Sequence, residues 1–359
     1  MPTLTAIIAA TDQPPTLAAC LDAIQKAAEP PEELIVVEAP YKDRPPNARN
    51  TGAARATGEV LVFIDADVLV HPDVFVRIRR TLSKPDAPAG VIGSYDDSPA
   101  APGHVSRFRN LLHHYVHTSS PGDVPTFWTG LGAVRRRQFL DIGGLDSELF
   151  GLYDIKFGMD LTAAGFRVEL DPEIRGQHLK HWTLRSMSST DLIQRGMPWL
   201  SLLIEYRQLP APLSLGWRHK ASALLSVAGL FALAARRARL AATAGLAFVW
   251  LNRGFYALLH RQEGSRAAAA GVVLHVYHHA IGAAAVGAGA VAYATDASWR
   301  GASFRPTPTG RNGHAAAQSN GRPSPLGASP PSPLSLGAKN GGPPRNGAAA
   351  KPPRVPASA

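Results

Sequence analysis

Short apolar runs alternate with helix-like segments through the first part of the 359-residue chain. The runs are Leu4–Ala10, Glu33–Val37 and Val60–Ile64, and the segments between them, Thr16–Ala28 and Ala48–Thr57, have helical spacing. This alternation predicts an α/β fold with a mainly parallel sheet and helices on both faces. In such sheets ligands bind outside the carboxyl ends of the strands, so the residues directly after each run are the first candidates for a site.

The third run ends abruptly in two aspartates. Val60–Val70 reads VLVFIDADVLV, which puts Asp65 and Asp67 at the carboxyl end of a predicted strand. Alternate residues of an extended segment share one side, so both carboxylates can approach one cation. Oxygen ligands favour a hard divalent ion such as Mg²⁺ or Mn²⁺. The alternative, for this pattern taken alone, is a turn with two solvated aspartates.

The residues around this pair resemble a known family. The stretch PNARNTGAARATGEVLVFIDADVLVHPD closely resembles the core signature of family 2 glycosyltransferases, in the GT-A superfamily of nucleotide-diphospho-sugar transferases. The segments TFWTGLGAVRRRQFLDIGGLDSELF and DPEIRGQHLKHWTL extend the resemblance over residues 3–210. It implies a Rossmann-like GT-A fold and the inverting transfer of a sugar from a nucleotide-sugar donor to a hydroxyl or phosphate acceptor.

The resemblance also implies residues that bind the donor. Thr11 and Glu38 fall at the positions that contact the base and the ribose, and Arg49 falls near the diphosphate. Asp65 matches a contact to the ribose or to a metal-bound water. The alternatives are an ordinary loop acid for Glu38 and a solvated helix charge for Arg49.

Metal and acceptor residues follow from the same resemblance. Asp67 matches the metal ligand proper, with Asp65 and His178 as further candidate ligands for Mn²⁺ or Mg²⁺. Trp128 and Gly130, in the sequence TFWTGLG, resemble the acceptor-binding segment. A structural histidine and a core tryptophan are the alternatives for His178 and Trp128.

The predicted catalytic base is Asp154. The family usually has a G-x-E-D-x-D-L pattern, whereas this chain reads GLYDIK from Gly151, so that only Asp154 keeps its acid. A general base must be ionised; burial would raise its pKa, and Lys156 would favour the charged form. The alternative is an aspartate that caps the following helix. The missing acids motivate a second hypothesis, a membrane-anchored pseudo-glycosyltransferase that binds nucleotide sugar without turnover.

The second half of the chain is unusually apolar. Ala268–Ala294 is a run of 27 residues without Asp, Glu, Lys or Arg, which exceeds the roughly 20 residues that a membrane-spanning helix needs. We therefore expect this run to cross a membrane. An Ala-rich soluble bundle is the alternative. The run also contains His275, His278 and His279, for which packing is favoured over a metal site.

Two shorter uncharged segments precede this run. Ala221–Ala235 and Leu240–Leu251 are separated by Arg236, Arg237 and Arg239. A simple hairpin that crossed from a cytoplasmic domain would carry these arginines outside, against the positive-inside tendency. We therefore expect this part to be re-entrant or interfacial.

Most of the net charge of +10 belongs to the end of the chain. Residues 297–359 are rich in Pro, Gly, Ala, Ser and Asn and contain eight basic and no acidic residues. Such a segment cannot bury enough apolar surface to fold, and we expect it to be disordered. The rest has 29 bases against 27 acids, which argues against a nucleic-acid-binding protein. A single cysteine, Cys20, excludes a disulfide framework.

These observations predict three regions. Residues 1–212 would form the glycosyltransferase domain, 213–296 a membrane-associated helical region and 297–359 a disordered basic tail. The N-terminal segment has no basic region before its apolar run, so we expect no secretory signal. Nucleotide sugars are made in the cytosol. We therefore expect a cell-membrane protein whose catalytic domain is cytoplasmic and whose acceptor is lipid-linked or a cell-envelope glycan.

Overall fold

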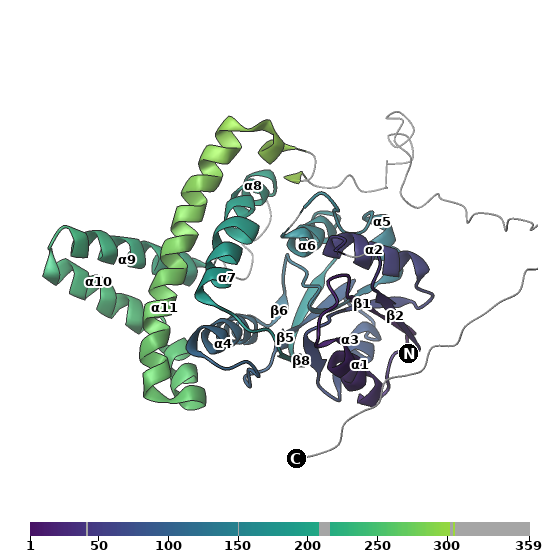
Figure 1. The fold of residues 1–359 in the computed structure, drawn as a ribbon. Helices are drawn as coiled ribbons and strands as arrows, with labels where there is room; N and C mark the ends of the chain where they lie inside the picture. The colour runs from purple at the N-terminus through teal and green to yellow at the C-terminus, as the bar shows by residue number, and fades with distance from the viewer. Residues whose placement is uncertain (41, 150, 208–215, 302–303, 306–359) are drawn as a thin grey trace, which may run out of the picture. The chain divides into compact units, whose positions relative to one another are not determined.

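The predicted apolar runs form three neighbouring parallel strands. A computed structural model describes residues 1–40, 42–149, 151–207, 216–301 and 304–305, all within one unit, Met1–Ser319 (Figure 1). Strand β1 (Leu4–Ala9) pairs in parallel with β2 (Glu33–Val37) on one side and with β3 (Val60–Asp65) on the other. The crossovers contain α1 (Leu17–Lys26) and α2 (Pro45–Arg55). The α/β class expected from the sequence is confirmed.

The other half of the sheet contains reversed strands. Strand β7 (Leu131–Arg135) is antiparallel to both of its neighbours, β3 and β5 (Gly90–Tyr95). Strand β8 (Val168–His178) is parallel to β5, so β1, β2, β3, β5 and β8 run in one direction. The order is β2-β1-β3-β7-β5-β8-β4, where β4 is Val68–Val70, and β6 (Gly122–Asp123) also pairs with β8.

Aromatic side chains fill the core between the sheet and its helices. Phe63 of β3 contacts Phe139 of α5 (Arg136–Asp141), with ring centroids 5.4 Å apart. Phe157, on α6 (Tyr153–Ala163), lies 5.2 Å from Phe139. Helix α3 (Val74–Leu82) contacts β5 and β8. This packing fixes the carboxyl ends of the strands, where the candidate site lies.

The last long helix packs against three helices that precede it in the chain. Helix α11 (Arg253–Thr295) contacts α4 (His104–Thr118), the π-helix η1 (Thr190–Gly196) and α8 (Met197–Glu205). Its backbone is broken at Gly264, which has a φ of 81°. Among the described residues, α11 is the one helix long and apolar enough to cross a membrane, judged by length and composition.

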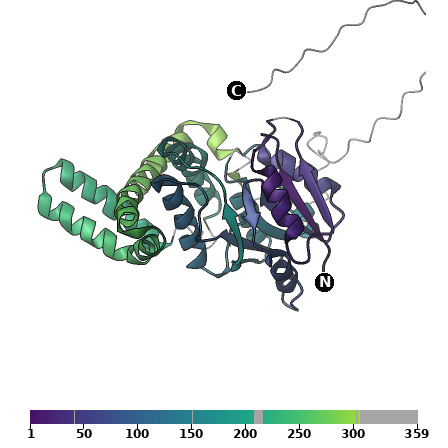
Figure 2. The ribbon, with the colours of Figure 1, turned by 60° about the horizontal axis from the view of Figure 1, so that its bottom comes forward.

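Helices α9 (Trp217–Ala234) and α10 (Ala238–Leu251) form an antiparallel hairpin beside α11 (Figure 2). At the hairpin base, Phe248 of α10 joins a second apolar cluster with Phe108 of α4 and Phe255 of α11. The short helix α7 (Leu184–Ser189) contributes Met187 to the same cluster.

The segment expected to be a tail begins with ordered residues. Ala297–Arg300 forms a 3-10 helix, η3, and the Trp299 ring stacks on Phe304 at a centroid distance of 6.1 Å. Both pack on a third cluster that includes Tyr206. The rest of the predicted tail, from residue 306, lies outside the described residues.

Candidate active site

The DAD sequence marks the carboxyl end of β3. Asp65 is the last residue of that strand, and its backbone N–H donates to the Gly130 carbonyl at 3.0 Å. A Cβ on Gly130 would lie 2.5 Å from the Trp128 indole, so only glycine at this position leaves room for the ring. The predicted acceptor residues Trp128 and Gly130 therefore lie directly beside the DAD sequence.

A buried guanidinium neutralises Asp65. Arg49 of α2 is only 4% exposed, and its Nη2 donates to Asp65 Oδ1 while its Nη1 donates to the Tyr153 hydroxyl at 3.1 Å. Burial alone would lower the pKa of Arg49, but the charges of Tyr153, Asp65 and Asp154 outweigh it and raise that pKa. Arg49 is thus a fixed cation of the site and not a solvated helix charge.

Asp67 faces His178 at the end of β8. The Asp67 Oδ2 and His178 Nε2 atoms are 3.5 Å apart, and His178 Nδ1 is 2.6 Å from Asn110 Oδ1. An amide oxygen only accepts, so Nδ1 donates to Asn110 and Nε2 is the ring atom that faces Asp67. A carboxylate oxygen and an imidazole nitrogen in this position are both ligands that a divalent cation accepts.

Asp67 and His178 fit a divalent cation, and the role of Asp65 as a further ligand stays a prediction. In the part of the chain that the structure describes, no three His, Cys, Asp or Glu side chains converge as a metal site. Burial alone would raise the pKa of Asp67; the bond to His178 and the charges of His178 and Lys180 outweigh it and lower that pKa. The carboxylate of Asp67 is therefore ionised and available to a cation.

Asp154 lies in the first turn of α6 and does not cap it. The capping residue is Leu152, with a left-handed φ of 61° and no side-chain bond to the helix. Asp154 is 9% exposed, and its Oδ1 accepts from the Ile155 N–H at 2.8 Å. Burial raises the pKa of Asp154 above its usual value, although the charges of Arg195 and Arg49 oppose this. Lys156, expected to help, is instead directed to Asp160, with Nζ 2.8 Å from Oδ2.

Two cavities meet at Asp154. The smaller, of about 160 Å³, is polar and lies over the strand ends, where Asp65, Asp67 and Lys180 line it. The larger, of about 410 Å³, lies among α4, η1, α9 and α11. Side chains that line both cavities are Tyr95, Trp128, Asp154, His178, Trp182 and Arg195. A group held in one cavity can therefore reach a group held in the other.

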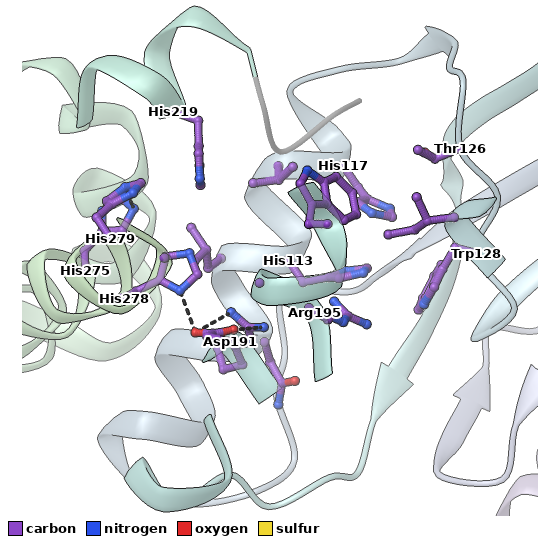
Figure 3. A pocket seen from close by; sticks show the side chains of 18 of the residues that line it. His113, His117, Thr126, Trp128, Asp191, Arg195, His219, His275, His278 and His279 are labelled. Atoms are coloured by element: carbon purple, nitrogen blue, oxygen red, sulfur yellow. Dashed lines mark hydrogen bonds and ion pairs between the residues drawn. The ribbon is translucent and has the colours of Figure 1, made fainter. Parts of the chain in front are cut away.

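Histidines line one wall of the larger cavity, on the side formed by α9 and α11 (Figure 3). His275 and His279 of α11 are buried, with their Nε2 atoms 3.1 Å apart, and His278 Nδ1 lies 2.7 Å from Asp191 Oδ2. Asp191 also pairs with Arg109, between Oδ1 and Nη2, at 2.7 Å. The three histidines of the apolar run are thus packed residues.

Arg195 is a site residue that sequence reasoning missed. It projects from the π-helix η1 into both cavities, between Asp191 and Trp128 in Figure 3. Within the described ranges its guanidinium has no hydrogen-bond or ion-pair partner. No sequence pattern indicates a π-helix, although such helices occur often at functional sites.

The predicted base and ribose contacts lie apart from the two cavities. Thr11 and Glu38 follow the paired strands β1 and β2, where Ala9 is in register with Val37. The Thr11 hydroxyl donates to the Asp43 carbonyl at 2.9 Å, whereas Glu38 is exposed. Neither lines either cavity. Their roles in nucleotide binding stay predictions.

Comparison with known protein families matches the N-terminal part of the chain. Residues 7–143 match the family model of glycosyl transferase family 2. The structure is similar to mannosyltransferase PcManGT from Pyrobaculum calidifontis in complex with GDP-Man and Mn²⁺, at 19% identity over 82% of this chain and 88% of that chain, with a TM-score of 0.47. It is also similar to S. aureus TarS 1-349, at 12% identity over 81% of this chain and 91% of that chain, with a TM-score of 0.40. By its matched sequence, this chain carries a glycosyl transferase family 2 domain and is a glycosyltransferase.

Proposed function

We propose that the enzyme transfers a sugar from a nucleotide-sugar donor to a hydroxyl or phosphate group of a lipid-linked acceptor or cell-envelope glycan, with inversion. The observation that carries this proposal is the position of Asp154, which lines both the polar cavity over the strand ends and the larger cavity among the helices. The first suits a donor diphosphate and the second suits an acceptor.

The donor cavity has the charges that a diphosphate requires. Lys180 and Arg195 line it, with Lys180 Nζ 4.5 Å from the Trp182 ring centroid, and Arg49 pairs with Asp65 at its edge. Asp67 and His178 are the residues that would hold Mn²⁺ or Mg²⁺. Such an ion offsets the negative charge that grows on a departing diphosphate. Thr11 and Glu38 are proposed to contact the nucleoside.

Asp154 is proposed as the general base. It would accept the proton of the acceptor hydroxyl while the acceptor oxygen bonds to the anomeric carbon and the bond from that carbon to the diphosphate breaks. Attack opposite the leaving group inverts the configuration. The raised pKa of Asp154 makes it a stronger base than an ordinary aspartate, and Arg195 favours its ionised form. An acceptor that is already an ionised phosphate would need no such base.

The lining of the larger cavity supports an amphiphilic acceptor. Trp128, Trp182 and Val286 give it apolar surface, and burial lowers the pKa of His117 to about 4, so that this ring stays neutral. Arg195 and Lys220 add positive charge. A lipid-linked phosphate combines both properties. On this ground we also propose that the protein acts at the cell membrane, with its catalytic domain on the cytoplasmic side.

Donor screening tests the proposal. The purified chain is mixed with a panel of nucleotide sugars and Mn²⁺, and thermal shift identifies the donor, because a ligand that binds only the folded state raises its stability. Release of nucleotide diphosphate is then measured with and without polyprenyl phosphate in detergent. We expect one donor to stabilise the protein and the lipid to accelerate its consumption. Donor binding without turnover on any acceptor would contradict the proposal.

A further inference from the structure

The α9–α10 hairpin exposes an apolar surface. Between Ser226 and Phe248 no residue is buried, although this stretch reads VAGLFALAARRARLAATAGLA. On α9, Trp217, Leu224 and Phe231 are 71%, 69% and 71% exposed. Because they are seven residues apart, they lie on one face of the helix. A soluble monomer rarely exposes apolar surface of this extent, so something of apolar character covers it.

The charge of the hairpin identifies that cover as an anionic surface. Arg236, Arg237 and Arg239 cluster at its tip, and the chain has no Asp or Glu between Glu205 and Glu263. A second copy packed tip to tip would bring these arginines against one another without a compensating acid. Anionic lipid head groups supply the missing negative charge, and acyl chains cover the apolar stripe.

Two backbone N–H groups and one hydroxyl of the tip are paired within the protein. The Arg236 and Arg237 N–H groups donate to the Leu233 and Ala232 carbonyls at 3.0 and 2.8 Å. The Thr243 hydroxyl, a polar side-chain group of the protruding part, donates to the Arg239 carbonyl at 2.9 Å. Polar groups paired in this way can enter the apolar zone of a membrane.

The hairpin is too short to cross a bilayer. Its protruding arm on α9, from residue 227 to Ala234, reaches about 12 Å at 1.5 Å per residue, against a hydrocarbon core of about 30 Å. Upright insertion would leave three arginines at mid-depth. Only an orientation parallel to the membrane keeps Arg236, Arg237 and Arg239 among the head groups and the stripe among the acyl chains.

Helix α11 packs one of its faces against the protein. Its buried residues run along one face, from Ala267, Gly271, His275 and His279 to Gly289. A Cβ on Gly289 would lie 2.7 Å from the Met197 carbonyl oxygen of α8. A crossing α11 would carry the catalytic-domain helices that it contacts into the bilayer. The proposal below therefore places α11 beside the membrane, whereas the composition of Ala268–Ala294 predicts a span.

We propose that the α9–α10 hairpin, residues 217–251, lies in the plane of an anionic membrane surface. The stripe of Trp217, Leu224 and Phe231 enters the acyl chains, and the three tip arginines contact the head groups. This inference rests on the proposed membrane association but does not depend on the transfer chemistry. At the hairpin base, His219 and Lys220 line the larger cavity, which is thereby held at the membrane surface.

Vesicle flotation of the full chain tests the proposal. Vesicles of phosphatidylcholine are compared with vesicles that also contain phosphatidylglycerol. Arg236→Gln/Arg237→Gln/Arg239→Gln should weaken binding to the anionic vesicles by about 100-fold at low salt, since each basic residue near the surface contributes a factor of about five. Arg55→Gln/Arg80→Gln/Arg137→Gln removes the same charge from exposed positions of the catalytic domain and should bind like the wild type.

Two further measurements separate the alternatives. Leu224→Ser/Phe231→Ser should lose vesicle binding but keep the donor-induced thermal shift, so that failure here is distinct from failure of the proposed function. Arg237→Cys, with vesicles added outside, should react with an impermeant maleimide, since the native Cys20 is buried. Protection of Arg237→Cys would indicate crossing and overturn the proposal. Equal binding by all variants, or a change in oligomeric state without a change in flotation, would also overturn it.

Discussion

The Asp67 carboxylate and the His178 imidazole face each other at 3.5 Å, between Oδ2 and Nε2, although one follows β3 and the other ends β8. Asn110 of α4 fixes the imidazole through Nδ1 at 2.6 Å. This three-residue arrangement has the form of a metal ligand supported by an outer hydrogen bond. The relationship joins three distant segments of the chain at one edge of the sheet.

Asn110→Ala should weaken Mn²⁺ binding by about 10- to 100-fold, because an outer-shell partner orients its ligand. Asp67→Asn should weaken it further. Quenching of tryptophan fluorescence by Mn²⁺ measures the affinity without reference to activity. His181→Ala, at an exposed histidine of the same segment, is the control and should bind Mn²⁺ normally. Unchanged affinity in both test variants would exclude this metal site.

Arg49→Met should lower the free energy of unfolding by about 1–3 kcal/mol, because it removes the charged partner of Asp65 and a donor to the Tyr153 hydroxyl. Asp65 is 32% exposed on its side chain, so water can partly replace the lost guanidinium. Urea unfolding measures the change. Arg55→Met, at the exposed end of the same helix, should stay within about 0.5 kcal/mol of the wild type.

Gly130→Ala should destabilise the protein by about 1–3 kcal/mol, because the new methyl group meets the Trp128 indole at 2.5 Å. Displacement of this ring should also raise the KM for the acceptor more than the KM for the donor. Gly287→Ala is the control, since a Cβ there meets nothing within 4 Å. If Gly130→Ala and Gly287→Ala have the same stability and the same acceptor KM, the position of the Trp128 ring does not depend on Gly130.

The pH dependence of transfer should reflect the raised pKa of Asp154. As pH falls through this pKa the base is protonated, so the acidic limb of kcat/KM should lie above the value of about 3.9 for an ordinary aspartate. Arg195→Gln removes a charge that lowers this pKa and should move the limb to higher pH. Arg185→Gln changes an exposed residue; it is the control and should not move the acidic limb. A limb that Arg195→Gln shifts to lower pH would contradict the assignment.

Local sequence predicted the strands, because each strand depends on neighbouring residues. The runs Leu4–Ala10 and Val60–Ile64 form β1 and β3, and Asp65 ends β3 as expected. The antiparallel insertion of β7 between β3 and β5 was not predictable, since its register, such as Phe63 opposite Gly132, is set by pairing across the sheet.

Other features depend on contacts between segments that are distant in the sequence, so local sequence did not predict them. The uncharged run Ala268–Ala294 has the composition of a span, and only its contacts with α4, η1 and α8 reveal a packed face. Arg195 escaped notice because a π-helix has no sequence signature, and Asn110 because its role appears only beside His178. Lys156 lies two residues from Asp154, yet helical geometry directs it to Asp160.

Asp154→Asn tests the central claim most directly. The Asn side chain keeps an acceptor for the Ile155 N–H, and a group with a raised pKa is less stabilising when ionised, so the variant should be at least as stable as the wild type at pH 7. Transfer to a hydroxyl acceptor should fall by at least about 10²-fold while the donor-induced thermal shift is unchanged, with Asp141→Asn on the surface as a normal control. Native turnover in Asp154→Asn, or parallel loss of stability and donor binding, would contradict the role of Asp154 as the base.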